Sequence, residues 1–256
     1  MKILILGGTT EARQLAGALD SRGDAEIILS LAGRTAAPRA QGVPTRIGGF
    51  GGADGLVRFI EAEKIGMLID ATHPYADQIS LNADQAARET GVLFLALRRP
   101  PWMAVPGDTW TEVATVADAA ATLGQHPARV FLALGRKDIA PFESAPHHAY
   151  LLRSVDPIDP PLTVPNAVYV TARGPFSEAG DRLLLQQHGI EFIVSKNSGG
   201  EASYGKIAAA RALGIPVVMI QRPALPEAPS AATVGEALAW CDHALTVAPA
   251  LRAAKH

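Results

Sequence analysis

Short apolar runs alternate with amphipathic stretches along most of this chain. Runs rich in β-branched residues predict strands, and apolar residues that recur at helical spacing predict helices. The expected strands are Ile3–Leu6, Glu26–Leu31, Thr45–Ile47, Met67–Asp70, Val92–Leu97, Arg129–Leu134, Ala149–Arg153, Ala167–Thr171, Glu191–Ser195 and Pro216–Ile220. The expected helices are Glu11–Arg22, Gly55–Lys64, Gln78–Thr90, Val116–Leu123, Glu178–His188, Ser203–Leu213 and Val234–Ala244. Because strands alternate with helices, the pattern predicts parallel sheets that are covered by helices on both faces.

The alternation is interrupted by two proline-rich stretches, RRPPW at 98–102 and DPIDPPLTVP at 156–165. The first indicates the end of an N-terminal sheet, and a second sheet fills the remainder. We therefore expect an α/β protein with two doubly wound, Rossmann-like domains, 1–104 and 105–245, and a tail at 246–256. The Ala- and Pro-rich segment beyond Pro223 is expected only to pack or dangle. The ligand cleft is expected between the domains. Thr233 and Glu236 predict a capping box for the last helix.

Composition narrows the protein class only mildly. The net charge of −2 provides no extended basic surface for nucleic acid. The single cysteine, Cys241, excludes an internal disulfide and a cysteine-rich metal site. No apolar run approaches the roughly 18 residues of a membrane span, and the apolar core of the start MKILILGG is too short for a signal peptide. These features favour a soluble, cytoplasmic protein without a metal centre.

The first eleven residues, MKILILGGTTE, predict a phosphate-binding turn. An expected strand leads into Gly7 and Gly8, and a helix begins after Thr9 and Thr10, with Glu11 in its first turn. Glycine lets a ligand approach the backbone, and the N–H groups at the start of the helix face the anion. The spacing is not G-x-G-x-x-G, so a structural turn without a ligand stays an alternative.

The end of the second expected strand favours NADPH over NADH. In dinucleotide sites this position meets the adenosine ribose, where an acid selects NAD and an Arg accommodates the 2′-phosphate of NADP. The chain has no Asp or Glu between Ile27 and Thr45, whereas Arg34 is followed by Thr35, and Arg39 lies nearby. An ordinary surface arginine is the alternative.

Two further loops of the first domain are candidates for cofactor contacts. GGFGG can bring the backbone of Gly49 and Gly51 against the cofactor, with Phe50 packing on a ring; a flexible loop is the alternative. The loop ATHPYA follows the fourth expected strand, so Thr72, His73 and Tyr75 could line the nicotinamide pocket. His73 is either an acid or base or a packing residue fixed by Pro74.

Cations gather in the strand-end loops of the second half. They are Arg136, Lys137, Arg173, Lys196 and Arg222, with Lys206 on the following helix, and only Asp138 and Glu201 are acids among them. Several cations at one edge of a nearly neutral protein predict a ligand with several carboxylates or phosphates. The segment SKNSGGEASYGK leads into a helix start that can hold an anion; a solvated helix start is the alternative.

Several catalytic classes are not supported by the sequence. None of the four tyrosines has a lysine four residues later, which argues against the short-chain dehydrogenase mechanism. The patterns G-x-S-x-G, H-E-x-x-H and G-x-x-x-x-G-K-[ST] are absent, which leaves a serine hydrolase elbow, a zincin and a P-loop without support. His147 and His148 form a loop pair without nearby ligand partners, which argues against a metal site.

Taken in order, several segments resemble the precorrin-6A reductase family of cobalamin biosynthesis. They are ILILGGTTEARQLA, GRT, GGFGG, DATHPYADQISLNA, ARGPFSEA and VSKNSGGEASYGKIAAARALGIPVVMIQRP, and the most specific are DATHPYA and KNSGG. The resemblance extends to about Pro223 and implies two Rossmann-like domains. It also implies NADPH-dependent reduction of one macrocycle double bond, from precorrin-6A to precorrin-6B. Neighbouring enzymes of that pathway are possible partners.

A tetrapyrrole-derived substrate with many acetate and propionate groups would account for the cations. On this resemblance the substrate contacts come from residues of the second half: Arg173, Lys196, Asn197, Ser198, Gly199, Tyr204, Lys206 and Arg222. Lys196 and His73 are the candidate catalytic residues, although solvent could also deliver the proton. A non-catalytic NADPH-sensing or anion-binding protein and a reductase of another polycarboxylate stay as alternatives.

Overall fold

The computed structural model describes residues 1–33 and 41–253, with side chains described up to position 246. Arg34, Thr35 and Arg39 therefore lie outside the described residues. The chain forms two compact units, of which one combines Met1–Pro100 with Pro223–His256 and the other is Pro101–Arg222. Each unit contains one six-stranded sheet in which all strand pairs are parallel. The expected α/β fold with two Rossmann-like domains is confirmed.

The sheet of the first unit has the order β3-β2-β1-β4-β5-β12. Its strands are β1 (Lys2–Leu6), β2 (Glu26–Leu31), β3 (Thr45–Ile47), β4 (Ile65–Asp70), β5 (Leu93–Leu97) and β12 (Ser230–Ala231). With β12 in sixth place, this is the 3-2-1-4-5-6 order of dinucleotide-binding sheets. The order reverses between β1 and β4, so the loops that follow these two strands meet at the switch point.

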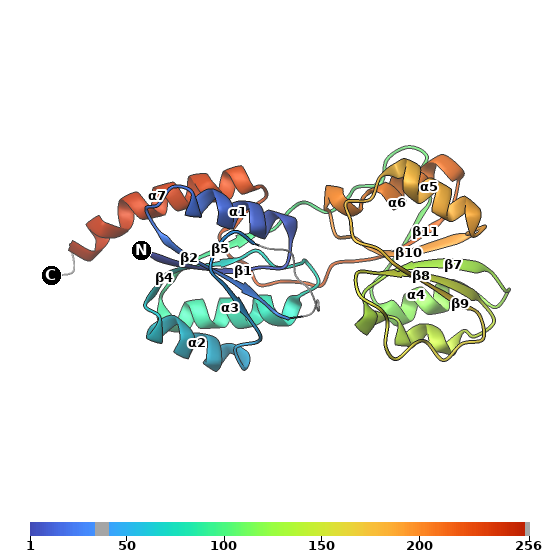
Figure 1. Ribbon diagram of the computed structural model, residues 1–256, viewed down its shortest axis with the longest axis horizontal. Helices are drawn as coiled ribbons and strands as arrows, with labels where there is room; N and C mark the ends of the chain where they lie inside the picture. Colours follow the sequence, from blue (N-terminus) through green and yellow to red (C-terminus); the bar gives the residue numbers. More distant parts are fainter. Residues whose placement is uncertain (34–40, 254–256) are drawn as a thin grey trace. The chain divides into compact units, whose positions relative to one another are not determined.

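Helices cover both faces of this sheet (Figure 1). They are α1 (Thr10–Asp20), α2 (Gly52–Ala62), α3 (Asp77–Thr90) and α7 (Val234–Ala253). Ile3 and Ile5 of β1 join the core on the side of α1 and α7, whereas Leu4 and Leu6 join the core on the side of α2 and α3. Alternate residues of β1 thus fill two different cores, which is why the strand reads as a continuous apolar run.

The sheet of the second unit repeats this plan with the order β9-β8-β7-β10-β11-β6. Its strands are β6 (Trp110–Val113), β7 (Arg129–Ala133), β8 (Ala149–Ser154), β9 (Ala167–Thr171), β10 (Phe192–Lys196) and β11 (Val217–Ile220). The helices are α4 (Val116–Thr122), α5 (Glu178–Gln187) and α6 (Gly205–Leu213), with the 3-10 turns η1 (Arg136–Asp138), η2 (Ala140–Ser144) and η3 (Glu201–Ser203). α5 and α6 lie on one face and α4 on the other (Figure 1).

The structure divides the chain differently from the expected ranges 1–104 and 105–245. Residues beyond Pro223 return to the first unit, where β12 pairs with β5 and α7 packs on α1. Ala237 and Cys241 of α7 are fully buried in the first core, so this segment is part of the fold rather than a dangling tail. The expected tail at 246–256 is also too long, because α7 continues to Ala253.

Sequence reasoning missed β6 and β12 because both are short edge strands. β12 has two residues, and Trp110–Val113 leaves its side chains half-buried or exposed, so neither strand shows an apolar run. Among the described residues, no helix is long and apolar enough to cross a membrane.

Candidate functional site

The turn after β1 uses its two glycines differently. A Cβ atom on Gly7 would lie 2.6 Å from Leu29 Cδ1, so this glycine lets the turn pack closely against β2. Gly8 has a φ of +118°, and no atom lies within 4 Å of the place where its Cβ would be. The backbone at Gly8 is therefore open to a ligand in a conformation that side-chain-bearing residues rarely adopt.

Thr9 joins the two loops that flank the switch point of the first sheet. Its hydroxyl caps α1 by accepting a hydrogen bond from Ala12 N (3.0 Å) and donates one to the carbonyl of Ala71 after β4 (2.9 Å). Thr10 is exposed at the first position of the helix. The turn 7–10 is thereby fixed against the loop after β4 at the positive end of α1.

Glu11 is paired with an arginine that sequence reasoning did not select. Arg99, from the loop after β5, donates a hydrogen bond from Nη1 to Glu11 Oε2 at 2.6 Å. The pair is mostly buried and lies beside the start of α1. The Glu11 carboxylate offsets the charge of Arg99, and the sequence signal for this arginine was RRPPW, which we interpreted as a domain boundary.

Asp70, at the end of β4, organises the loop that contains Thr72. Its buried carboxylate accepts hydrogen bonds from Thr72 Oγ1 (2.7 Å), Thr72 N (3.1 Å) and Ser80 Oγ (2.6 Å). A carboxylate with three donors costs little to bury, and it fixes the backbone around Thr72. Thr72 is thus held at the carboxyl edge of the sheet, and its hydroxyl is already engaged.

His73 and Tyr75 lie in the same loop, half-buried. Tyr75 N donates to His73 Nδ1 (3.3 Å), and the two rings are 5.7 Å apart. Because Nδ1 accepts a hydrogen bond, the neutral ring carries its proton on Nε2. In this tautomer the Nε2–H group of His73 can donate a hydrogen bond to a ligand, whereas the basic Nδ1 is engaged by Tyr75 N.

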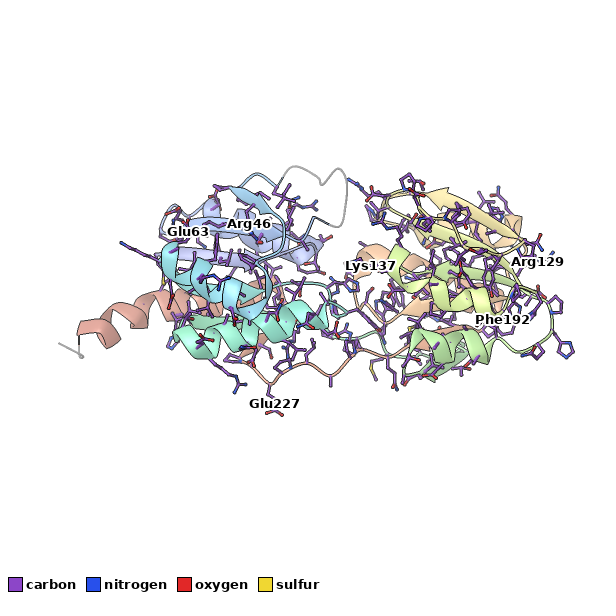
Figure 2. All side chains as sticks on the ribbon, turned by 90° about the horizontal axis from the view of Figure 1, so that it is seen from below. Arg46, Glu63, Arg129, Lys137, Phe192 and Glu227 are labelled. Carbon is purple, nitrogen blue, oxygen red and sulfur yellow. The ribbon has the colours of Figure 1, made fainter. Side chains whose placement is uncertain are left out.

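The GGFGG loop is held by Arg46 of β3, labelled in Figure 2. The Arg46 guanidinium donates to Ser30 Oγ (3.1 Å), Gly48 O (2.8 Å) and Gly49 O (3.0 Å), and it stacks 3.9 Å from the centre of the Phe50 ring. Phe50 also packs edge-on against Phe59 of α2. The structure thus places the Phe50 ring in packing with Arg46 and Phe59, whereas Gly49 and Gly51 are exposed.

In the second unit, β7 and β10 flank the corresponding switch point. Figure 2 shows Lys137, which follows β7, at one end of this unit and Arg129 and Phe192, which begin β7 and β10, at the other. Lys196 is the last residue of β10, and its Nζ lies 2.8 Å from Asp138 Oδ2 in η1. The structure therefore brings Lys196 together with an acid to which the sequence had assigned no role.

Asn197 is committed to a structural contact. Its Oδ1 accepts a hydrogen bond from Trp102 N (2.7 Å) and its Nδ2 donates one to Trp102 O (2.9 Å). The side chain thereby fastens the incoming segment of the unit to the end of β10. Arg222 Nε donates to the carbonyl of Asn197 (2.9 Å), and Ser198 Oγ is 3.0 Å from Ser203 Oγ.

Lys206 lies in the interior rather than among the surface cations. It is 4% exposed, its Nζ donates to Ser203 O (2.7 Å) and lies 4.8 Å from the centre of a Trp102 ring. Burial lowers the pKa of Lys206 to about 7, and the Arg153 cation adds to this lowering while Asp181 opposes it. Arg153 and Asp181 form a buried ion pair.

The loops ARGPF and SKNSGGEAS pack on each other. Phe176 N donates to Ala202 O (2.9 Å), and a Cβ on Gly205 would lie 2.7 Å from Phe176 O, so only glycine fits there. Arg173 is exposed after β9. Beside these loops is an open pocket of about 360 Å³, lined by Trp102, Met103, Gly199, Glu201 and Tyr204.

Comparison with known proteins identifies the family. The family model described as precorrin-6x reductase CbiJ/CobK matches residues 2–242. The chain belongs to the precorrin-6x reductase family. The match covers both units, including β12 and α7 as far as Asp242.

Relatives of this reductase family cover nearly the whole chain. A precorrin-6A reductase of Sinorhizobium sp is 54% identical over 247 residues, which is 96% of this chain and 95% of that protein. The precorrin-6A reductase of Rhodobacter capsulatus is 50% identical and covers 96% and 98%, respectively. A cobalt-precorrin-6A reductase of Priestia megaterium is 30% identical, with 86% and 90% covered. A solved structure of CobK precorrin-6A reductase superimposes with a TM-score of 0.91 at 50% identity, covering 95% and 97%.

Proposed function

We propose that this protein is an NADPH-dependent reductase that converts precorrin-6A to precorrin-6B in cobalamin biosynthesis. The observation that carries the proposal is a family match over both units together with a dinucleotide-type sheet whose Gly7–Gly8 turn is open at the switch point. The near full-length relatives named precorrin-6A reductase support the substrate.

The first unit suits a dinucleotide. The open backbone at Gly8 and the N-terminus of α1 offer N–H groups to a pyrophosphate, and the Arg99–Glu11 ion pair lies beside the start of this helix. Thr72, His73 and Tyr75 are the residues that would lie nearest the nicotinamide. Arg34 and Thr35 are proposed at the 2′-phosphate, and Gly49 and Gly51 along the adenosine half.

The second unit suits a large polycarboxylate ring. The pocket beside η3 offers the apolar faces of Trp102 and Tyr204, and Arg173 and Arg222 supply positive charge in the loops after β9 and β11. Cations at this edge favour a substrate that carries several carboxylates and increase its rate of association. Ser198 and Gly199 are proposed to contact the substrate from the same loop.

The reaction adds a hydride and a proton across one carbon–carbon double bond. NADPH, when bound, supplies the hydride. The residues of the chain bind and orient the two reactants, which accounts for much of the rate when the reacting atoms are held in line. Lys196, at the end of β10, is proposed to supply the proton to the neighbouring carbon.

The test is turnover with purified protein and precorrin-6A, followed by the loss of reduced-nicotinamide absorbance and by mass spectrometry of the product. We expect a product heavier by two hydrogens and a higher kcat/KM with NADPH than with NADH. Arg34→Ala should reduce that preference while NADH binding changes little. NADPH binding without any product would instead support the alternative of an NADPH sensor. Consumption of NADPH only with another polycarboxylate would show that precorrin-6A is not the substrate.

A further inference from the structure

We propose that Asp138 is the positioning residue that holds Lys196 for protonation of the substrate, an inference that rests on the proposed reductase function. The two side chains meet at 2.8 Å between Nζ and Oδ2, at the switch point of the second sheet. Lys196 ends β10, and Asp138 ends the 3-10 turn that follows the adjacent strand β7. They therefore come from the two strand ends where ligands bind in sheets of this type.

The local backbone places the Asp138 carboxylate for this contact. Asp138 N donates to Gly135 O (2.9 Å), which closes the turn η1 and returns the side chain toward β10. A Cβ on Gly135 would lie only 3.1 Å from Asp138 Oδ2. A larger residue at position 135 would therefore crowd the carboxylate that pairs with Lys196.

The pairing changes what Lys196 can do for a substrate. An ammonium whose charge is offset by a carboxylate at 2.8 Å is a weak attractor of substrate carboxylates, and Asp138 itself repels them. The two side chains are 18% and 27% exposed, so the pair is mostly buried but still open to solvent on one side. The contact with Asp138 instead fixes the position of the Lys196 Nζ at the carboxyl ends of the strands.

The chemical step is balanced by one hydride and one proton. When one carbon of the double bond accepts the hydride, the electron pair of that bond moves to the neighbouring carbon. That pair takes a proton from the Lys196 ammonium, so an N–H bond breaks and a C–H bond forms. Lys196 then regains a proton from the solvent, and Asp138 takes no part in the transfer beyond its contact with the Lys196 Nζ.

A double-mutant cycle tests whether Asp138 acts through Lys196. We expect Asp138→Asn to lower kcat by at least about tenfold with little change in KM, because the proton donor is no longer held in place. Lys196→Ala should lower kcat further. In the Lys196→Ala background, Asp138→Asn should cause no additional loss, since residues that act as a unit are not additive.

A matched control lies at the other end of the same strand. Glu191 precedes β10, and its carboxylate accepts a hydrogen bond from Arg129 N (2.9 Å). This contact lies at the amino ends of the strands, opposite to the carboxyl ends where Lys196 and Asp138 meet. Glu191→Gln removes one exposed carboxylate from the same unit. We expect it to leave kcat unchanged, which separates the effect of Asp138 from a general change in charge.

A second readout needs neither substrate nor cofactor. Acetylation of Lys196 by acetic anhydride, followed by mass spectrometry of the ligand-free protein, reports whether Asp138 holds the Nζ in place, because a side chain held in an ion pair is less available to the reagent than a released one. Asp138→Asn should raise the labelling rate at Lys196 severalfold relative to that at exposed lysines, and Glu191→Gln should not.

The outcomes separate this inference from the proposed function. If Asp138→Asn lowers kcat equally with and without Lys196, Asp138 acts independently and the inference is wrong. It is also wrong if Lys196→Ala keeps full kcat, or if Asp138→Asn leaves kcat unchanged whatever the labelling rate, although the enzyme then still reduces precorrin-6A. Wild-type protein without any turnover overturns the proposed function and the protonation step with it, while the labelling rates still report the ion pair.

Discussion

Gly7 and Gly8 are neighbours in sequence, and a glycine is favoured at each position for a different physical reason. At Gly7 a side chain would collide with Leu29, whereas at Gly8 it would meet no protein atom but would need a φ of +118°. Packing therefore explains the first glycine. At Gly8 the open space and the positive φ are compatible with the proposed phosphate contact, which the position of Gly8 before α1 favours.

Gly8→Ala should weaken NADPH binding at least about tenfold, because a methyl group would stand where the pyrophosphate approaches. It should also lower stability by about 1–3 kcal/mol through backbone strain. Gly23→Ala is the control, since Gly23 also has a positive φ (+71°) and open space around it. Gly23 lies in the loop between α1 and β2, at the amino ends of the strands and away from the proposed phosphate site. Calorimetric titration should show unchanged NADPH affinity for Gly23→Ala; an equal loss in both variants would contradict the phosphate site.

Lys206 shows how burial redirects a residue that looks like a surface cation in the sequence. Trp102, the Ser203 carbonyl and the Arg153–Asp181 pair surround its amine. Burial lowers its pKa to about 7 from the ordinary 10.5. Between these two pH values the unfolded chain binds more protons than the folded one, so stability rises with pH.

Lys206→Met should therefore raise the free energy of unfolding at about pH 6 by an amount on the order of a few kcal/mol, where the full penalty of the buried charge is present. It should also flatten the rise in stability between about pH 7 and 10. Urea unfolding over this pH range measures both effects. A variant that is less stable than wild type at pH 6 would show that the charged lysine is well compensated where it lies.

Among the elements, α7 packs into a hydrophobic core that is built mostly from residues near the other end of the chain. Its residues Ala237 and Cys241 are fully buried with Ile3, Ile5 and Leu15 of the first unit. Burial raises the pKa of the Cys241 thiol to about 11, so this cysteine is an unreactive packing residue.

At the start of α7, Glu236 N donates to Thr233 Oγ1 (3.1 Å), while the Glu236 carboxylate accepts from Ala232 N (2.9 Å). Of the two hydrogen bonds of the expected capping box, the one accepted by the Thr233 hydroxyl is present. The Glu236 carboxylate accepts from Ala232 N and not from Thr233 N.

Ala237→Asp should destabilise the first unit by several kcal/mol, since it places an unpaired charge in the core. Ala239→Asp, two residues along the same helix on an exposed position, should change stability by less than about 1 kcal/mol. Thermal unfolding monitored by circular dichroism compares the two variants. Equal effects would mean that α7 does not pack on the sheet as described.

At the scale of the whole molecule, the two units differ in how the chain builds them. The second unit is continuous, and all six strands of its sheet lie within Pro101–Arg222. The first unit is discontinuous, because its sixth strand and last helix are supplied by the segment after Pro223. Its core is therefore complete only when both ends of the chain are present.

A fragment of residues 101–222 should fold alone, whereas a fragment of residues 1–100 should be unstable because the face covered by α7 is exposed. Joining residues 223–246 to the 1–100 fragment through a flexible linker should restore cooperative unfolding. Two-dimensional NMR spectra of the three fragments provide the measurement. Well-dispersed signals from residues 1–100 alone would contradict the structural role of β12 and α7.

The sequence by itself determined the elements that carry strong local signals. Continuous apolar runs such as Ile3–Leu6 and helical periodicity such as that of α1 are set by short-range geometry, so ten strands and seven helices were expected close to their observed positions. The parallel α/β class followed from their alternation. The turn at Gly7–Gly8 and the loop after β4 were placed at a binding edge by the same reasoning, and the binding roles of their residues stay predictions.

Only the tertiary structure decided which partners these residues meet. The pairing of β12 with β5 joins positions more than a hundred residues apart, and it leaves no local pattern in a two-residue strand. Likewise Lys206 and Lys196 are both lysines of one segment, yet the first is buried and the second is paired with Asp138. Burial and charge pairing depend on what the fold places around a side chain, and the order of residues does not specify this directly.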